Sequence, residues 1–117
     1  MGLKILDSKE ELAEIHSVLA TATLVTTERA KQYGSPHKAT SHIAKMWTAL
    51  LSPKLKDGEE ITHSDVNMLM ICLKLVRTSN DNMHKDSWVD IAGYCGVAWS
   101  ALVGEQFNGE KPCSKKP

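Results

Sequence analysis

The chain has 117 residues and a mass of 12.9 kDa, which corresponds to a single domain. Lys and Arg total 14 and Asp and Glu total 14, so 14 − 14 leaves no formal net charge, and duplex nucleic acid is not an expected partner because its phosphates favour a basic surface. No apolar run reaches the roughly 18 residues that a membrane span needs, and the acidic N-terminus is unlike a signal peptide, so we expect a cytoplasmic protein with no membrane partner.

The first predicted helix begins at Ser8, whose hydroxyl caps the helix while Glu11 completes a capping box. The Thr-rich stretch 21–27 consists of weak helix formers, so we expect an interruption there. The helical pattern resumes over residues 28–33. The Gly-Ser-Pro sequence at 34–36 then predicts the end of the helix.

A second helix is predicted from about Thr40 to Leu51, followed by a charged loop over residues 53–61. The third helix opens with Thr62 and Asp65, another capping-box pair, and continues to about residue 78. Its middle, VNMLMICLKLV, is apolar almost all round. Such a helix lies either at the centre of a bundle or in a subunit interface.

A polar connection leads to the fourth predicted helix, which starts at Asp86 or Ser87 and reaches about Gln106. No segment shows the period-two alternation of a β-strand. We therefore predict that residues 1–107 form one all-α domain, a four-helix bundle that associates as a dimer or higher oligomer. Residues 108–117 are predicted to be a disordered polar tail.

Two sets of residues on the predicted helices favour packing rather than chemistry. A ridge of small side chains recurs every four positions on the fourth helix and predicts a tight helix–helix contact, within the subunit or across a dimer. The three tryptophans, Trp47, Trp88 and Trp99, are expected in the core rather than as ligand platforms. The ridge consists of Ala92, Gly96, Ser100 and Gly104.

Asp86 and Asp90 are four residues apart at the start of the fourth helix, so their carboxylates share one face, and Tyr94 continues that row. Like charges at this spacing destabilise a helix unless something offsets them. A divalent cation would do so, because paired carboxylates suit Mg²⁺ or Mn²⁺. Alternatively, Asp86 serves only as a favourable acid at a helix start.

Asp65 is the third candidate metal ligand, alongside Asp86 and Asp90. Its alternative role is local, because its carboxylate can accept a hydrogen bond within the capping box of the third helix. On a helical wheel it shares a stripe of apolar residues that we expect to face inward. The other members of that stripe are Met68, Leu69, Cys72 and Val76.

Lys74 and Arg77, three residues apart on the third helix, are candidate phosphate ligands, Arg through a bidentate fork and Lys as a point charge. Arg29 and Tyr33 form a second possible site for an anion and a ring. Trp88, beside the acidic pair, is a candidate for stacking on a base. Tyr94 is a further candidate ligand-binding residue. The alternative for the cations is a solvated face or ion pairs with neighbouring acids.

The histidines and cysteines form no metal motif. His37 and His42 are five residues apart, and His63 and His84 fall at predicted helix starts or in loops, where a solvated or capping role is expected. The cysteines lack the CxxC spacing of a zinc site and are odd in number, so no disulfide framework is indicated. They are Cys72, Cys95 and Cys113.

Four sequence segments in order, ERAKQYGSP, IAKMW, DVNMLMICLKLVR and KDSWVDIAGY, resemble an uncharacterised family of small proteins encoded by phages and prophages. The resemblance covers about residues 27–102. More distantly, the pattern is similar to the all-α nucleotide pyrophosphohydrolases of the MazG kind. Their two acidic motifs, Glu-x-x-Glu and Glu-x-x-Asp, hold magnesium at a triphosphate.

The MazG resemblance implies that Asp90 corresponds to the Asp of the second motif, whose Glu position falls on Ser87, next to Asp86. The first motif has no counterpart in the third helix. Glu11 and Glu14 have its spacing but lie outside the resembling region. The resemblance therefore implies a MazG-like bundle whose acidic metal site is incomplete.

Three functions follow from these patterns. The first is a Mg²⁺-dependent nucleoside triphosphate pyrophosphohydrolase in the cytoplasm of an infected bacterium, with Asp86 and Asp90 as its catalytic residues. The second is a non-catalytic protein that sequesters a host nucleotide signal. The third is a structural or protein-interaction module, favoured by the apolar third helix. The first two predict a nucleotide as the small-molecule partner.

Overall fold

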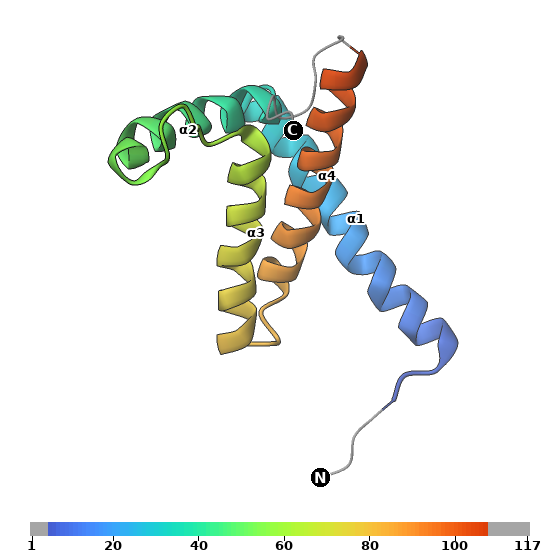
Figure 1. The fold of residues 1–117 in the computed structure, drawn as a ribbon. Helices are drawn as coiled ribbons and strands as arrows, with labels where there is room; N and C mark the ends of the chain where they lie inside the picture. Colours follow the sequence, from blue (N-terminus) through green and yellow to red (C-terminus); the bar gives the residue numbers. More distant parts are fainter. Residues whose placement is uncertain (1–4, 108–117) are drawn as a thin grey trace.

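The computed structural model describes residues 5–107, and within that range the chain is helical with no β-strand, as the sequence predicts (Figure 1). None of the helices in these residues is long and apolar enough to cross a membrane. The polar tail predicted for residues 108–117 lies outside the described residues. The elements are α1 (Ser8–Tyr33), α2 (Pro36–Leu51), the short 3-10 helix η1 (Ser52–Lys54), α3 (His63–Asn80) and α4 (Lys85–Phe107).

The helices α3 and α4 form an antiparallel pair joined by a short turn (Figure 1). His63 at the start of α3 contacts Glu105 near the end of α4, and Lys74 further along α3 contacts Asp90 near the start of α4. The helix α2 lies across one end of the pair. The helix α1 packs on α4, and its N-terminal half extends away from the other helices.

The start of α1 is capped one residue earlier than the sequence predicts. Asp7 Oδ1 accepts a hydrogen bond from the Glu10 backbone N–H at 2.8 Å, and Glu10 Oε1 accepts one from the Asp7 N–H at 3.1 Å. This is a capping box, with Asp7 rather than Ser8 as the cap. Both residue types cap well, so the choice between neighbours was not visible in the sequence.

The interruption predicted at residues 21–27 is wrong, because α1 is continuous from Ser8 to Tyr33. The threonine hydroxyls there donate to backbone carbonyls in the preceding turn, for example Thr21 Oγ1 to Ser17 O at 2.8 Å. They are therefore satisfied within the helix rather than competing with it. Packing of Ala22 on α4 also outweighs the weak intrinsic preference of threonine.

Of the next three helix boundaries, the end of α1 and the beginning of α3 are as predicted, whereas α2 begins earlier than predicted. Gly34, at φ 84°, ends α1 in a backbone region that favours glycine. The α2 helix then starts at Pro36, earlier than the predicted Thr40, because Ser35 is its cap and proline suits the first helical position. The predicted capping box between Thr62 and Asp65 is present.

The helices α1 and α4 lie close together at Gly93. A Cβ added there would lie 3.3 Å from Thr26 Cγ2, a tight contact that would require Thr26 or the helix spacing to adjust slightly. The contact predicted for the small-residue ridge is thus displaced by one position. Added Cβ atoms at Gly96 and Gly104 would meet nothing within 4 Å, so the ridge is open within this subunit.

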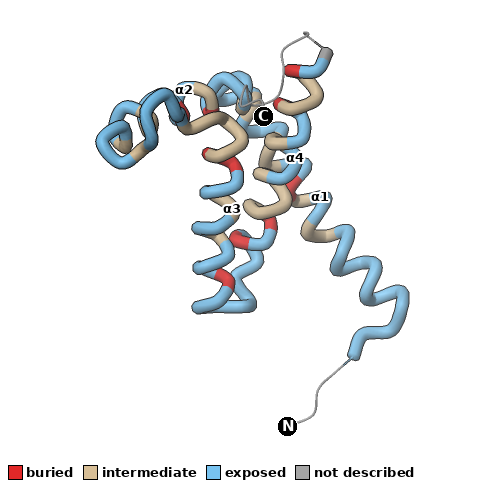
Figure 2. Tube along the Cα trace, viewed as in Figure 1, coloured by how far each residue is buried: buried red, intermediate tan, exposed pale blue. Residues whose placement is uncertain are grey.

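The buried interior is small and contains few large apolar side chains (Figure 2). Its apolar members in the described part of the chain are Ala22, Ala44, Val66, Val89 and Ala101. The stripe predicted to face inward on α3 instead faces solvent, because α4 and α2 pack on the opposite side of that helix. Trp88 and Trp99, predicted in the core, are also exposed, whereas Trp47 is half-buried.

The loop before α3 is attached to α2 by the Thr48 hydroxyl. Thr48 Oγ1 accepts a hydrogen bond from the Ile61 backbone N–H at 2.8 Å and donates one to Ala44 O at 2.7 Å. Ile61 and Thr48 are both half-buried, so the N–H would lose its partner without gaining full access to water. This bond therefore fixes the chain direction leading into the α3 capping box.

Replacing Thr48 by Val keeps the side-chain shape but removes the acceptor for the Ile61 N–H. We expect a loss of about 1–2 kcal/mol in the free energy of unfolding, measured by urea denaturation. Thr27→Val is the matched control, because the exposed Thr27 hydroxyl bonds only within its own helix. The control should change stability by no more than about 0.5 kcal/mol. Equal losses in both variants would contradict the tethering role of Thr48.

Candidate functional site

A cavity of about 300 Å³ lies where α1, α2 and α4 meet. Four residues that the sequence analysis singled out line it, Arg29 and Tyr33 from α1 and Asp90 and Tyr94 from α4. Most of the remaining lining is apolar or small. These other residues are Ala22, Val25, Thr26, Gly34, Pro36, Ala39, Thr40, Ile43, Val89, Gly93 and Val97.

Helical spacing places the four residues in two rows. Arg29 and Tyr33 are one turn apart at the end of α1, and Asp90 and Tyr94 are one turn apart on α4. Because α1 crosses α4 closely at Gly93, the two rows face a common space. Tyr33 is 74% exposed and stands at the mouth, whereas the Asp90 side chain is only 18% exposed and lies deeper.

The Asp90 carboxylate is held by Lys74 of α3. Lys74 Nζ lies 3.0 Å from Asp90 Oδ2, and the Lys74 side chain is 12% exposed. In a pair this far from solvent, each side chain fixes the position of the other. The alternative considered for Lys74, an ion pair with a neighbouring acid, is therefore what the structure shows.

Two other predicted ligand-binding residues lie apart from this cavity. Arg77 is exposed near the end of α3 and is not among the lining residues. Trp88 is partly exposed, and its indole Nε1–H donates to Asn82 O at 2.9 Å across the α3–α4 turn. The structure thus does not bring Arg77 or Trp88 together with Arg29, Tyr33, Asp90 and Tyr94.

The three predicted metal ligands do not converge. The Asp65 carboxylate caps α3, where its Oδ2 accepts from the Thr62 N–H at 2.9 Å, at the end of the helix far from Asp90. Asp86 is exposed in the first turn of α4. Residues 5–107 contain no group of three or more His, Cys, Asp or Glu side chains that could hold a metal ion.

The donors as they lie therefore do not fit a resident Mg²⁺ or Mn²⁺. The Asp90 carboxylate already has a cation beside it, and the Asp65 carboxylate is engaged by its own backbone. A hard divalent cation prefers several oxygen ligands in one place, which these residues do not supply. It remains a prediction that Mg²⁺ or Mn²⁺ enters the site together with a polyphosphate ligand.

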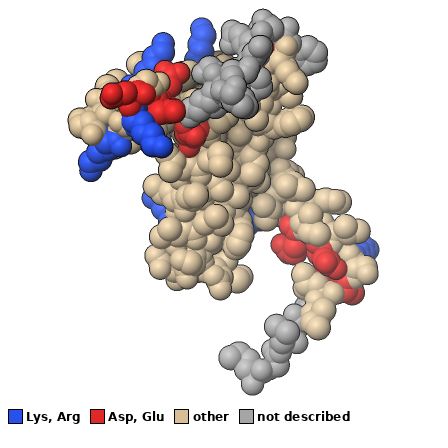
Figure 3. Space-filling view, viewed as in Figure 1, with Lys and Arg blue, Asp and Glu red and all other residues tan. Residues whose placement is uncertain are grey.

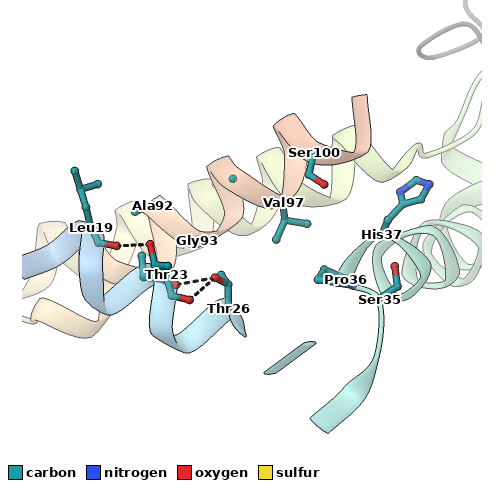
Figure 4. A pocket seen from close by; sticks show the side chains of 12 residues that line it. Leu19, Thr23, Thr26, Ser35, Pro36, His37, Ala92, Gly93, Val97 and Ser100 are labelled. Carbon is teal, nitrogen blue, oxygen red and sulfur yellow. Dashed lines mark hydrogen bonds between the residues drawn. The ribbon is translucent and has the colours of Figure 1, made fainter. Parts of the chain in front are cut away.

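A second cavity of about 460 Å³ adjoins the first and shares Ala22, Thr26, Pro36, Gly93 and Val97 with it. Figure 4 shows Leu19 and Thr23 of α1 on one side and Ser35 to His37 at the start of α2 on the other. Three members of the small-residue ridge line it, namely Ala92, Gly96 and Ser100. The ridge therefore borders a cavity whose other walls are α1 and the start of α2.

A buried polar cluster was missed by the sequence analysis. His63 Nε2 contacts Glu105 Oε1, both side chains are 10% exposed, and the His37 ring meets the His63 ring edge-on at 4.8 Å. Asn67 is fully buried next to His63 on α3. The solvated role expected for His63 is wrong, because its partner lies 42 residues away and no local signal marks such a pair.

The comparisons with known proteins place this all-helical domain in a sequence family. Residues 17–102 match the family described as "Domain of unknown function (DUF6378)", and the chain belongs to that family. No solved structure matches the chain.

Two curated relatives come from phages. The chain is 40% identical over 82 residues to the Gene 55 protein of Mycobacterium phage L5, covering 69% of this chain and 49% of that protein. It is 37% identical over 87 residues to the Gene 55 protein of Mycobacterium phage D29, covering 74% of this chain and 53% of that protein. The chain thus spans about half the length of these relatives.

These matches confirm the resemblance to a phage protein family, and the matched region includes the predicted range 27–102. The more distant similarity to MazG pyrophosphohydrolases is not shown by these comparisons and stays a prediction. The family is described only as a domain of unknown function.

Removing one member of the Lys74–Asp90 pair should destabilise the fold. We expect Lys74→Met to lower the free energy of unfolding by about 2 kcal/mol, because it leaves a largely buried carboxylate without its cation. The double variant Lys74→Met/Asp90→Leu should recover most of that loss. Urea denaturation of both variants measures these changes.

The control is Lys31→Met, which removes an exposed partner of Glu28 at 3.8 Å. Exposed pairs contribute little, so this variant should change stability by less than about 0.5 kcal/mol. A loss at Lys74→Met no larger than at Lys31→Met would show that the buried pair does not support the α3–α4 contact.

Proposed function

We propose that this protein binds a nucleotide in the cavity between α1, α2 and α4, in the cytoplasm of an infected bacterium. The observation that carries the proposal is the meeting of Arg29, Tyr33, Asp90 and Tyr94 around one space of about 300 Å³. This set combines a cation, two aromatic rings and an acceptor, which together match the phosphate, base and sugar of a nucleotide. Largely apolar pockets with a few convergent polar groups are typical ligand sites.

The walls of the cavity suit a planar base. Ile43 of α2 and Val89 of α4 supply apolar surface, and the rings of Tyr33 and Tyr94 supply aromatic surface. Base–aromatic stacking contributes about 1–3 kcal/mol and tolerates any base. The geometry therefore supports a nucleobase as the part that enters the cavity, without selecting which base.

The Asp90 carboxylate suits the donors of a base or sugar. Lys74 Nζ orients it from 3.0 Å, and Asp90 is one of the residues that line the cavity. An ionised carboxylate accepts hydrogen bonds from base N–H groups and from ribose hydroxyls. In the proposal Asp90 is a binding residue, and Lys74 positions it.

Arg29 suits the phosphates. It lines the cavity and is exposed to solvent, one turn before Tyr33 at the mouth. A guanidinium group binds phosphate oxygens in a bidentate manner without needing a metal ion. The phosphate chain in this proposal therefore points outward, past the end of α1.

Binding without cleavage is favoured over hydrolysis. The predicted catalytic pair, Asp86 and Asp90, shares a helix face, but the Asp90 charge is already balanced by Lys74. The acidic groups needed to hold a metal are not assembled in the described residues. We therefore place the sequestering function ahead of the pyrophosphohydrolase, and the experiment below distinguishes them.

The test is thermal unfolding of the protein with each common ribo- and deoxyribonucleotide, as mono-, di- and triphosphate, with and without Mg²⁺. We expect at least one nucleotide to raise Tm, because a ligand that binds only the folded state stabilises it. Denaturing the complex should release that nucleotide intact. Release of a monophosphate with pyrophosphate would establish the hydrolase instead, and no shift with any nucleotide would overturn the proposal.

Two matched variants locate the site. Arg29→Gln should weaken binding of that nucleotide by about tenfold, measured by isothermal titration, because it removes the phosphate fork. Arg77→Gln is the control, since Arg77 is equally solvent-facing but does not line the cavity. Equal weakening by both variants, or by Arg77→Gln alone, would move the binding site to α3.

A further inference from the structure

The apolar and aromatic walls of the cavity between α1, α2 and α4 tolerate any base, so the choice of base falls to its polar side chains. Two of these are exposed, namely Arg29 and Tyr33. The less exposed ones are Thr26, Thr40, Asp90 and Tyr94. A base that enters past the mouth therefore meets this second set, and the hydrogen-bonding capacity of these four side chains selects what binds.

The hydroxyls of Thr26 and Thr40 present acceptors to the cavity, because each already donates its proton within its own helix. Thr26 Oγ1 donates to Ala22 O at 2.9 Å, and Thr40 Oγ1 donates to Pro36 O at 3.1 Å. A hydroxyl has one proton, so only lone pairs remain on these two oxygens. A ligand group that approaches either oxygen must therefore bring a donor.

The Asp90 carboxylate is also an acceptor, and one of its oxygens has no partner within residues 5–107. Lys74 Nζ lies 3.0 Å from Asp90 Oδ2, whereas none of the described groups donates to Oδ1. Oδ1 is not sealed inside the protein, so a ligand in the cavity can reach it. Each carboxylate oxygen accepts about two hydrogen bonds, so Oδ2 also keeps a free lone pair beside Lys74.

A positively charged ligand would also supply donors, but the charges at the cavity oppose it. The charged side chains in its described lining are Arg29 and Asp90, and Asp90 already has Lys74 beside it. On the face that Figure 3 shows, acidic side chains gather near α2 and its following loop and on the N-terminal part of α1, whereas Asp90 lies on α4. A cation here would meet two positive side chains and one negative one, so a neutral group that carries donors is favoured.

We propose that the base bound in this cavity is guanine and that Asp90 selects it, an inference that rests on the proposed nucleotide-binding function. Guanine carries N1–H and the 2-amino group side by side, so two adjacent donors match the two oxygens of one carboxylate. The acceptor O6 on the same edge of guanine suits the Tyr94 hydroxyl, which lies one turn from Asp90 and is the one side chain of the four that can still donate.

The other common bases lack this pair of donors. Adenine and cytosine place one amino group beside a ring nitrogen that accepts, and uracil and thymine have one N–H between two carbonyl oxygens. Each would turn at least one lone pair toward the Asp90 carboxylate, which leaves both acceptors without a hydrogen bond. A site built around one hydrogen-bonding pattern rejects ligands that lack it far more strongly than a purely apolar pocket does.

The test on the unmodified chain is isothermal titration with nucleotides that differ only in the base. The probes are the 5′-monophosphates and 5′-triphosphates of guanosine, inosine, xanthosine and adenosine. Inosine lacks the 2-amino group and should bind about 10-fold more weakly than guanosine, because one hydrogen bond to the carboxylate is lost. Xanthosine, with a carbonyl in place of that amino group, and adenosine should bind at least about 100-fold more weakly.

A substitution at Asp90 tests which residue makes the choice. Asp90→Asn replaces one acceptor by a donor, which matches the N1–H and 2-carbonyl of xanthine, so the preference should reverse in favour of xanthosine over guanosine. Glu28→Gln is the matched control, since it removes one negative charge from an exposed residue of α1 that does not line the cavity, and it should leave that ratio unchanged. A guanosine preference that persists in Asp90→Asn would overturn the role of Asp90.

The two experiments separate failure of this inference from failure of the proposed function. Adenosine or a pyrimidine nucleotide that binds as tightly as guanosine would overturn the choice of guanine, while the nucleotide site would stand. Absence of binding by every nucleotide would overturn both. The analogue series needs no variant, so it decides the base even where Asp90→Asn loses stability with its Lys74 contact.

Discussion

The ion pair between Lys74 and Asp90 connects the packing of this domain with its candidate site. It joins α3 to α4 at one end of their contact, while the His63–Glu105 contact joins the same helices at the other end. Because the pair is largely shielded from water, it fixes the relative positions of the two helices more firmly than a surface pair would. It also decides the chemistry of Asp90, which becomes an oriented acceptor rather than a free metal ligand.

The parts of the fold that are determined by residues close together in the chain were predictable from the sequence. The Gly-Ser-Pro stop at residues 34–36 and the Thr62–Asp65 capping box are short-range signals, and both are present. The Thr-rich part of α1 was not predictable in this way, because packing on α4 decided its structure. The orientation of α3 was inferred from the assumption that apolar stripes face inward within one subunit, and that assumption fails here.

The candidate site was predictable in pieces but not as a whole. Helical spacing placed Arg29 with Tyr33 and Asp90 with Tyr94, since each pair lies one turn apart. That the two pairs face one cavity depends on the crossing of α1 and α4, which no local pattern encodes. The Lys74–Asp90 pairing and the His63–Glu105 pairing likewise join residues far apart in the chain, so the acids predicted to converge were assigned to the wrong partners.

The close contact at Gly93 has a consequence for how phage relatives of this protein can vary. A Cβ at position 93 would lie 3.3 Å from Thr26 Cγ2, so Thr26 or the spacing of α1 and α4 would have to adjust slightly at the wall that the two cavities share. Positions 96 and 104 carry no such restriction within the subunit. Substitutions should therefore be accommodated more readily at positions 96 and 104 than at the crossing itself.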